Sequence, residues 1–247
     1  MQHTVESVQI QSNFEELQWI LIDGGSTDGS VEYIEETKAK MSRRVEIISL
    51  SEKDKGIYDA MNKGLSLATG QYVWFLNSGD SLHSSLILSK LADKLHDVDS
   101  LPDVVYGDTM FVDEERNNLG LISKKKPQRY PQRLHGGSFR FGMNICHQSF
   151  LAKREIVSEY DLNYKQASDI DWIIGVLKRS KSSLDAKIVI SDFEVGGSSY
   201  QYTKKAWKER YQVLEKHYGK IPNFLAHIWI FCRRGIFYIQ GKLFGKR

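Results

Sequence analysis

The sequence predicts an α/β protein whose mostly parallel sheet carries helices on both faces. Three short runs, at residues 17–22, 45–50 and 71–76, are mostly apolar, which is typical of strands buried on both sides. Segments with helical spacing separate these runs. Strands that alternate with helices are typical of parallel sheets, whose ligands bind beyond the carboxyl ends of the strands.

The first 100 residues predict a regular alternation of elements. We expect helices at 4–11, 31–40, 57–68 and 84–95 around the three strands. In the third of these helices, Ile57, Met61, Leu65 and Ala68 recur at helical spacing before Gly70 ends the pattern. Polar, glycine-containing clusters at 23–30 and 77–80 follow the first and third strands. We therefore expect both clusters at the ligand-binding edge of the sheet.

The second half predicts a different arrangement. Strands at 104–112 and 119–123 form a hairpin, and a helix at 169–179 precedes a strand at 189–195. A basic and aromatic helical stretch follows from residue 201. We therefore expect one domain over residues 1–200, divided into halves 1–100 and 101–200, and a helical appendage at 201–247.

Composition and charge exclude several classes of protein. With 41% hydrophobic and 26% charged residues, the chain is too apolar for a disordered protein. A formal net charge of +3 is too small to indicate nucleic acid as a partner. Cys146 and Cys232 form no metal or redox spacing, which indicates free thiols in a reducing compartment. Because no apolar run reaches the roughly 18 residues of a spanning helix, we expect a cytoplasmic protein.

The segment 224–244 leaves two interpretations open. It interleaves aromatic residues such as Trp229 and Phe231 with cations such as Arg233 and Arg234. One interpretation is an interfacial helix on the anionic inner face of the plasma membrane, which would make this a peripheral membrane protein. The other is a helix packed on the core with its basic face in water.

Two acids follow predicted strands and are candidate ligand-binding residues. Asp80 comes directly after the strand at 71–76 and its Asn-Ser-Gly turn, where one or two carboxylates suffice for a phosphate-bound divalent cation. Its structural alternative is a helix-capping acid. Asp23 ends the first strand, and Gly24 beside it allows close approach of the backbone to a ligand.

Asp169 and His147 are further candidates. Asp169 opens the helix at 169–179, where a carboxylate could deprotonate an attacking hydroxyl, although acids are also favoured there by the helix dipole. Its position favours it over Asp171, which bulky Trp172 follows. His147 is either a hydrogen-bonded core histidine or a donor to a phosphate or acceptor group.

Several strings together resemble family 2 glycosyltransferases. LQWILIDGGSTDGSVEYIEE and SEKDKGIYDAMNKGLSLATGQYVWFLNSGDSLH resemble the nucleotide-binding half of the family, and ICHQSFLAKREI, ASDIDW and FEVGGSS resemble later parts. The resemblance covers roughly residues 4 to 200. It is greatest to enzymes that build bacterial capsules, colanic acid and lipopolysaccharide O-chains.

This resemblance implies a GT-A fold, with a nucleotide-sugar-binding half at 1–100 and an acceptor half at 101–200. It implies inverting transfer from a UDP- or GDP-sugar to a saccharide or lipid-linked acceptor, with Mg²⁺ or Mn²⁺ on the diphosphate. The site residues that it implies are as follows: Asp169 as catalytic base, Asp80 as metal ligand, Asp23, Gly24, Asp54, Asn62 and Lys63 at the donor, and His147, Gly196 and Gly197 on the acceptor or diphosphate side.

The chain departs from the family pattern in three places. The metal motif holds one carboxylate, Asp80, and the base motif reads Ser168-Asp169 where relatives often have Glu-Asp. The family also begins with a central strand before the helix at Thr4, and by comparison this chain lacks it. The alternative to an active enzyme is therefore a truncated, non-catalytic nucleotide-sugar-binding or scaffold homologue. A nucleotidyltransferase of similar fold has less support.

Overall fold

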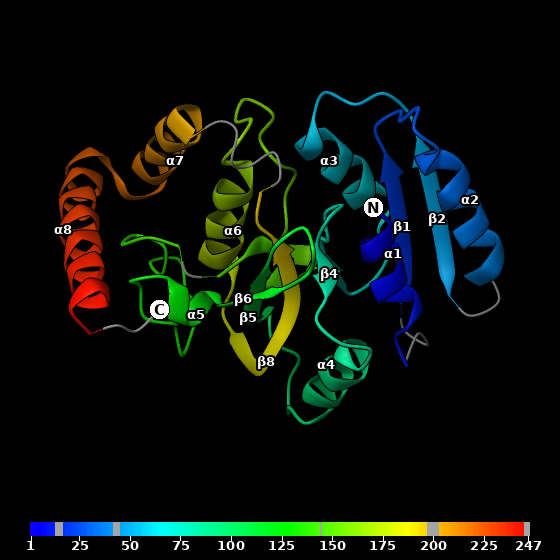
Figure 1. Ribbon diagram of the computed structural model, residues 1–247, viewed down its shortest axis with the longest axis horizontal. Helices are drawn as coiled ribbons and strands as arrows, with labels where there is room; N and C mark the ends of the chain where they lie inside the picture. Colours follow the sequence, from blue (N-terminus) through cyan, green and yellow to red (C-terminus); the bar gives the residue numbers. More distant parts are fainter. Residues whose placement is uncertain (13–16, 42–44, 144, 197–202, 245–247) are drawn as a thin grey trace.

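The computed structural model describes the chain except for residues 13–16, 42–44, 144, 197–202 and 245–247. Figure 1 shows an elongated arrangement, with strands β1 and β2 at one end, a larger sheet in the middle and helices α7 and α8 at the other end. The expected α/β fold, with helices flanking a central sheet, is confirmed.

Strands β1 (Gln18–Asp23) and β2 (Glu46–Ser51) form a two-stranded parallel sheet in which Asp23 pairs with Ser51. Helix α2 (Ser30–Met41) packs on β2, and α3 (Ile57–Leu67) packs on β1. The two strands run parallel because the crossover through α2 returns the chain to the same edge.

The larger sheet has the order β3 (Tyr72–Trp74), β7 (Phe150–Lys153), β5 (Val104–Val112), β8 (Ser183–Glu194) and β4 (Ser81–Leu82), with β6 (Asn118–Leu121) beside β5. Its pairs are antiparallel except for β5 with β8. The described sheet is therefore mixed, whereas the sequence predicts a mostly parallel one. The difference comes from the short strands β4 and β7, which had no recognisable pattern of their own.

The helices cover this sheet. Helix α1 (Gln2–Gln9) packs on β4, and α4 (Ile87–His96) packs on β8. Helix α6 (Ser168–Arg179) is followed by β8, and α7 (Thr203–Tyr218) packs between α6 and α8 (Lys220–Phe244). Short helices lie at α5 (Ile122–Lys125), His147–Ser149 and Arg154–Ile156.

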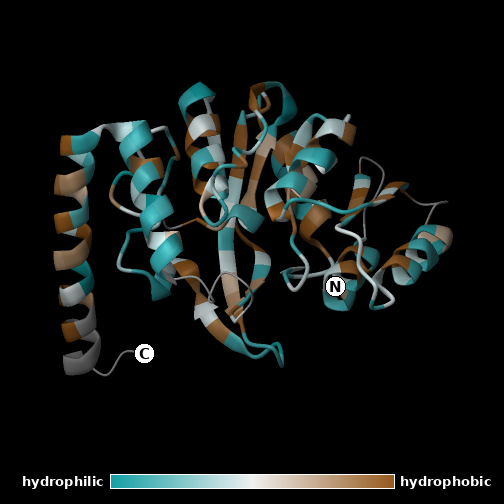
Figure 2. Ribbon diagram, turned by 90° about the horizontal axis from the view of Figure 1, so that it is seen from above, coloured by the Kyte–Doolittle hydropathy of each residue, from teal (hydrophilic) through white to brown (hydrophobic). Residues whose placement is uncertain are grey.

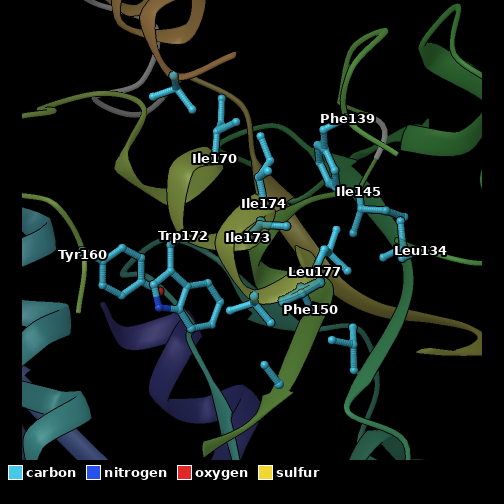
Figure 3. Close-up of a cluster of buried hydrophobic side chains, with 14 of the residues drawn as sticks. Leu134, Phe139, Ile145, Phe150, Tyr160, Ile170, Trp172, Ile173, Ile174 and Leu177 are labelled. Carbon is cyan, nitrogen blue, oxygen red and sulfur yellow. The ribbon is translucent and has the colours of Figure 1, made fainter. Parts of the chain in front are cut away.

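The larger hydrophobic core lies between the sheet and α6. Figure 3 shows Ile173, Ile174 and Leu177 of α6 directed toward Phe150 of β7, with Trp172 beside Tyr160. The periodicity that predicted this helix follows from that packing, since its apolar face is the buried one. Within the described part of the chain, no helix is both long and apolar enough to cross a membrane.

Candidate active site

A large cavity separates the two sheets at the edge where the predicted polar clusters lie. Its volume is about 1120 Å³, and its walls include the side chains of β1 and β3. In the described residues β1 pairs only with β2, and β3 only with β7, so neither strand spans the gap. At one end the Gln18 side chain accepts a hydrogen bond from the Thr69 amide, and at the other end Asp54, Asp80, Glu194 and Gly196 form a polar mouth.

Asp80 and Glu194 form the acidic part of this mouth. Asp80 is buried, with Oδ2 accepting from Gln148 Nε2 at 2.6 Å and Oδ1 accepting from the Glu194 amide at 3.0 Å. Arg116 lies 3.6 Å from the Glu194 carboxylate and donates to the Gly79 carbonyl. Burial raises the pKa of Asp80 to about 7, and the charge of Glu194 adds to that rise.

These two carboxylates are the residues best placed to hold a metal. The described part of the chain has no group of three or more metal-ligating side chains. A divalent cation that also binds substrate phosphates needs only one or two carboxylates, however. The Gly79 backbone has φ +98°, a conformation that favours glycine, and its turn carries Asp80 close to Glu194. A Cβ placed on Gly79 would lie 3.6 Å from the Glu194 carboxylate.

The end of β1 brings Asp23, Gly24 and Asp54 together. Asp23 Oδ2 accepts hydrogen bonds from Ser51 Oγ at 2.7 Å and from the amides of Gly25 and Ser26 at 2.9 Å. Burial by itself would raise the pKa of Asp23, but these hydrogen bonds lower it to about 2. Asp23 therefore shapes the loop and does not line the cavity, whereas Asp54 does. A Cβ at Gly24 would lie 2.4 Å from Asp54 Oδ2, so a larger residue here would displace the Asp54 side chain.

Asn62 and Lys63, the other expected donor residues, have structural partners. The Asn62 amide exchanges two hydrogen bonds with the Tyr160 backbone, of 3.0 and 2.7 Å, and so joins α3 to the second half of the chain. Lys63 Nζ lies 2.9 Å from Glu52 and donates to the Lys53 carbonyl, beside Asp54. Neither residue lines the cavity itself.

Asp169 lies at the start of α6 and is partly exposed. Its Oδ1 accepts a hydrogen bond of 3.0 Å from Tyr58 of α3. Burial raises the pKa of Asp169, although the Tyr58 hydrogen bond and the charge of Arg210 oppose the rise. By contrast, Asp171 pairs with Lys216 at 2.9 Å and His217 at 2.7 Å, which ties α6 to α7. The two acids therefore differ in their contacts, although they are two positions apart on one helix.

The segment Cys146–Gln148 is near both Asp80 and Asp169. The Gln148 side chain donates a hydrogen bond to Asp80. Burial raises the pKa of the Cys146 thiol to about 11, and the charges of Asp80 and Asp169 add to that rise. His147 is buried, and burial lowers its pKa to about 4. Its Nε2 lies 2.7 Å from the Tyr160 hydroxyl, and its ring packs on Phe75. This environment fits the core-histidine alternative.

The structure adds residues that the sequence did not single out. Gly196 lines the cavity, whereas Gly197 lies outside the described residues. Glu194 is part of the string FEVGGSS, but its role depends on β8 reaching the turn at Gly79. Arg116 and Arg210 come from a hairpin loop and from α7, and no motif marks either one.

Comparisons with known proteins agree with this fold. The sequence model of glycosyl transferase family 2 matches residues 1–161. A PGL/p-HBAD biosynthesis glycosyltransferase of Mycobacterium bovis is 30% identical over 203 residues, which are 77% of this chain and 71% of that protein. A glycosyltransferase of Haemophilus influenzae is 27% identical over 204 residues, covering 80% and 76% of the two chains.

Solved structures share the architecture. S. aureus TarS 1–349 in complex with UDP-GlcNAc gives a TM-score of 0.62 at 13% identity, over 86% of this chain and 61% of that one. The mannosyltransferase PcManGT of Pyrobaculum calidifontis, in complex with GDP-Man and Mn²⁺, gives 0.60 at 14% identity, over 94% and 69%. This chain thus spans about three fifths of the TarS chain. The fold is of the GT-A type.

An α/β sheet with carboxylates gathered at one edge and a GT-A architecture defines the class of the protein. The chain belongs to glycosyl transferase family 2. It is accordingly a glycosyltransferase.

Proposed function

We propose that the protein transfers a sugar from a UDP- or GDP-sugar to a saccharide or lipid-linked saccharide, with inversion, in cell-surface polysaccharide synthesis. The observation that carries the proposal is that two acids with raised pKa values, Asp80 and Asp169, lie close enough to the buried Cys146 thiol for both of their charges to act on it. Enzymes arrange such shifts where a carboxylate must bind a cation or a proton. The nucleotide sugars in the TarS and PcManGT complexes support the choice of donor.

On the donor side, Asp80 and Glu194 would hold Mg²⁺ or Mn²⁺. The residues fit such an ion, because Asp80 is a buried carboxylate whose pKa is raised by burial and lowered only in part by the charge of Arg116. When bound, the cation neutralises charge on the departing diphosphate. Asp54 at the cavity mouth, kept in place by Gly24, would contact the nucleoside.

On the acceptor side, Asp169 would remove the proton from the attacking hydroxyl. Its raised pKa strengthens it as a base, and the Tyr58 hydrogen bond fixes the direction of its carboxylate. Attack from the side opposite the diphosphate would invert the anomeric carbon. The charge of Arg210 opposes the rise in the pKa of Asp169 and so favours the ionised carboxylate.

The test compares two aspartates of one helix. Purified protein is supplied with UDP- and GDP-sugars and Mn²⁺, and release of the nucleoside diphosphate is measured. Asp169→Asn should abolish release while leaving nucleotide binding by calorimetry unchanged. Asp171→Asn, the matched control, should lower thermal stability but retain activity.

Two results would contradict the proposal. Activity that survives Asp169→Asn would remove the base from this residue. Nucleotide binding without any turnover in the wild-type protein would favour the non-catalytic homologue instead.

A further inference from the structure

Helix α8 presents its apolar face away from the rest of the protein. Its side chains toward α7 follow three- and four-residue spacing, and among them Asn223 and Ala226 are each only 1% exposed. The large apolar side chains of the opposite face, which we call the outward face, are between 49% and 81% exposed: Ile221, Phe224, Leu225, Ile228, Trp229, Phe231, Ile236 and Ile239. With 100° of rotation per residue, these side chains fall within an arc of roughly 160° around the helix axis.

The contacts of α8 with the body are largely polar. Asn223 Nδ2 donates to the Tyr211 carbonyl at 3.1 Å, and the Arg233 guanidinium donates to the Phe141 carbonyl. Arg234 lies over the ring of Trp207, with its Cζ 6.0 Å from the centroid. An ordinary surface helix buries its apolar stripe and exposes its polar one, and α8 does the reverse.

Such an arrangement indicates a binding surface. Large contiguous apolar patches are rare on soluble monomers and mark sites that another apolar phase covers. Figure 1 places α8 at the outer edge of the molecule, and Figure 2 shows apolar bands recurring along it. The surface is therefore open to a large, flat partner.

The charge of the region identifies the partner. Residues 203–247 contain eleven Lys and Arg against two Glu, whereas the remaining 202 residues hold 23 Lys and Arg against 29 acids. Helix α8 contains no acidic residue. Two copies meeting through this face would bring like charges together, and an anionic lipid surface would neutralise them.

We propose that α8 docks the protein onto an anionic lipid bilayer, with the outward face in the boundary between headgroups and acyl chains. The helix, about 37 Å long, would lie in the plane of the surface. Lys220 is exposed and lies just off the outward face, from which its long side chain can reach the headgroups. This inference is independent of the transfer reaction.

Cys232 provides a direct reporter. It is exposed and falls within the outward face, whereas Cys146 is buried, so a thiol-reactive fluorophore labels the helix at one position. The full chain, labelled there, is mixed with vesicles of equal parts phosphatidylcholine and phosphatidylglycerol. The emission should shift to the blue and the protein should float with these vesicles, but not with pure phosphatidylcholine.

A matched pair of double variants tests the outward face, in unlabelled protein. Ile228→Ser with Phe231→Ser should lower the partition coefficient by about tenfold or more, since two apolar side chains leave the boundary. Ile10→Ser with Leu86→Ser removes comparably exposed apolar groups elsewhere and should leave it unchanged. Circular dichroism melts check that both variants stay folded.

Three outcomes would overturn the proposal. These are no flotation with anionic vesicles, equal loss in both double variants, and a dimer by sedimentation that Ile228→Ser with Phe231→Ser dissociates without changing vesicle binding. The last result would assign the outward face to a second copy.

Discussion

Asp80→Asn should make the metal-free protein more stable at pH 8 while removing its activity. In the native state burial raises the pKa of Asp80 from 3.8 to about 7. The native protein therefore holds a proton that the unfolded chain releases, and the stability that this proton provides is lost as pH rises from about 4 to about 7. A shift of about three units corresponds to about 4 kcal/mol.

Part of that free energy is offset by a changed hydrogen bond. Asn keeps an oxygen for the Glu194 amide, and Gln148 can turn its own amide to face the new NH₂ group. We expect a net gain of about 2 kcal/mol at pH 8, which for a chain of this size raises Tm by about 4–8 °C. At pH 5 the two proteins should differ little.

The assay is thermal unfolding followed by circular dichroism in EDTA, at pH 5 and pH 8, with Asp28→Asn as a control on an exposed acid. Mn²⁺ with a nucleoside diphosphate should then stabilise the wild type and leave Asp80→Asn unchanged. The reasoning is refuted if Asp80→Asn shifts Tm equally at both pH values, or if Mn²⁺ stabilises the variant as well.

Three further predictions concern the contacts around the site. Gly24→Ala should weaken nucleotide binding, because the new Cβ would lie 2.4 Å from Asp54 Oδ2 and displace that side chain. Gly235→Ala, whose Cβ meets open space, should leave nucleotide binding unchanged, and calorimetry measures both variants. Asn62→Ala should lower the free energy of unfolding, measured in urea, by about 2–4 kcal/mol, since both hydrogen bonds to Tyr160 are lost. The stability of Asn62→Asp should fall between that of the wild type and that of Asn62→Ala. Asp23→Asn should be less stable than the wild type at pH 7 but equal to it near pH 2. The low pKa of Asp23 gives the wild type stability that is lost as pH falls from about 4 to about 2. Plots of Tm against pH that stay parallel for the two proteins would contradict this.

The sequence predicted the elements that have a strong pattern of their own. The helix expected at 169–179 is Ser168–Arg179, and the strand expected at 104–112 is Val104–Val112. Short strands were missed because two to four residues carry too little periodicity, as at Ser81–Leu82 and Phe150–Lys153. The strand expected at 189–195 begins earlier, at Ser183, because pairing with β5 extends it through polar residues.

The candidate site was predicted unevenly for a similar reason. Asp80 and Asp169 were found because each stands at the end or start of a predictable element. The partners of these acids come from distant parts of the chain. Glu194 reaches Asp80 across 114 positions, and Tyr58 reaches Asp169 across 111. Spacing along the chain contains no signal for such contacts.

By itself, the sequence determined the α/β class, the edge of the sheet where acids gather and the family resemblance, because these follow from local periodicity and contiguous motifs. Only the tertiary structure decided which contacts the candidate polar residues make. Asn62 and Asp171 are engaged in holding the two halves and helices together, whereas Asp80 and Asp169 stay in low-dielectric surroundings that raise their pKa values. It also decided that α8 turns its apolar face outward, since a helical pattern shows that a face exists but not what it contacts.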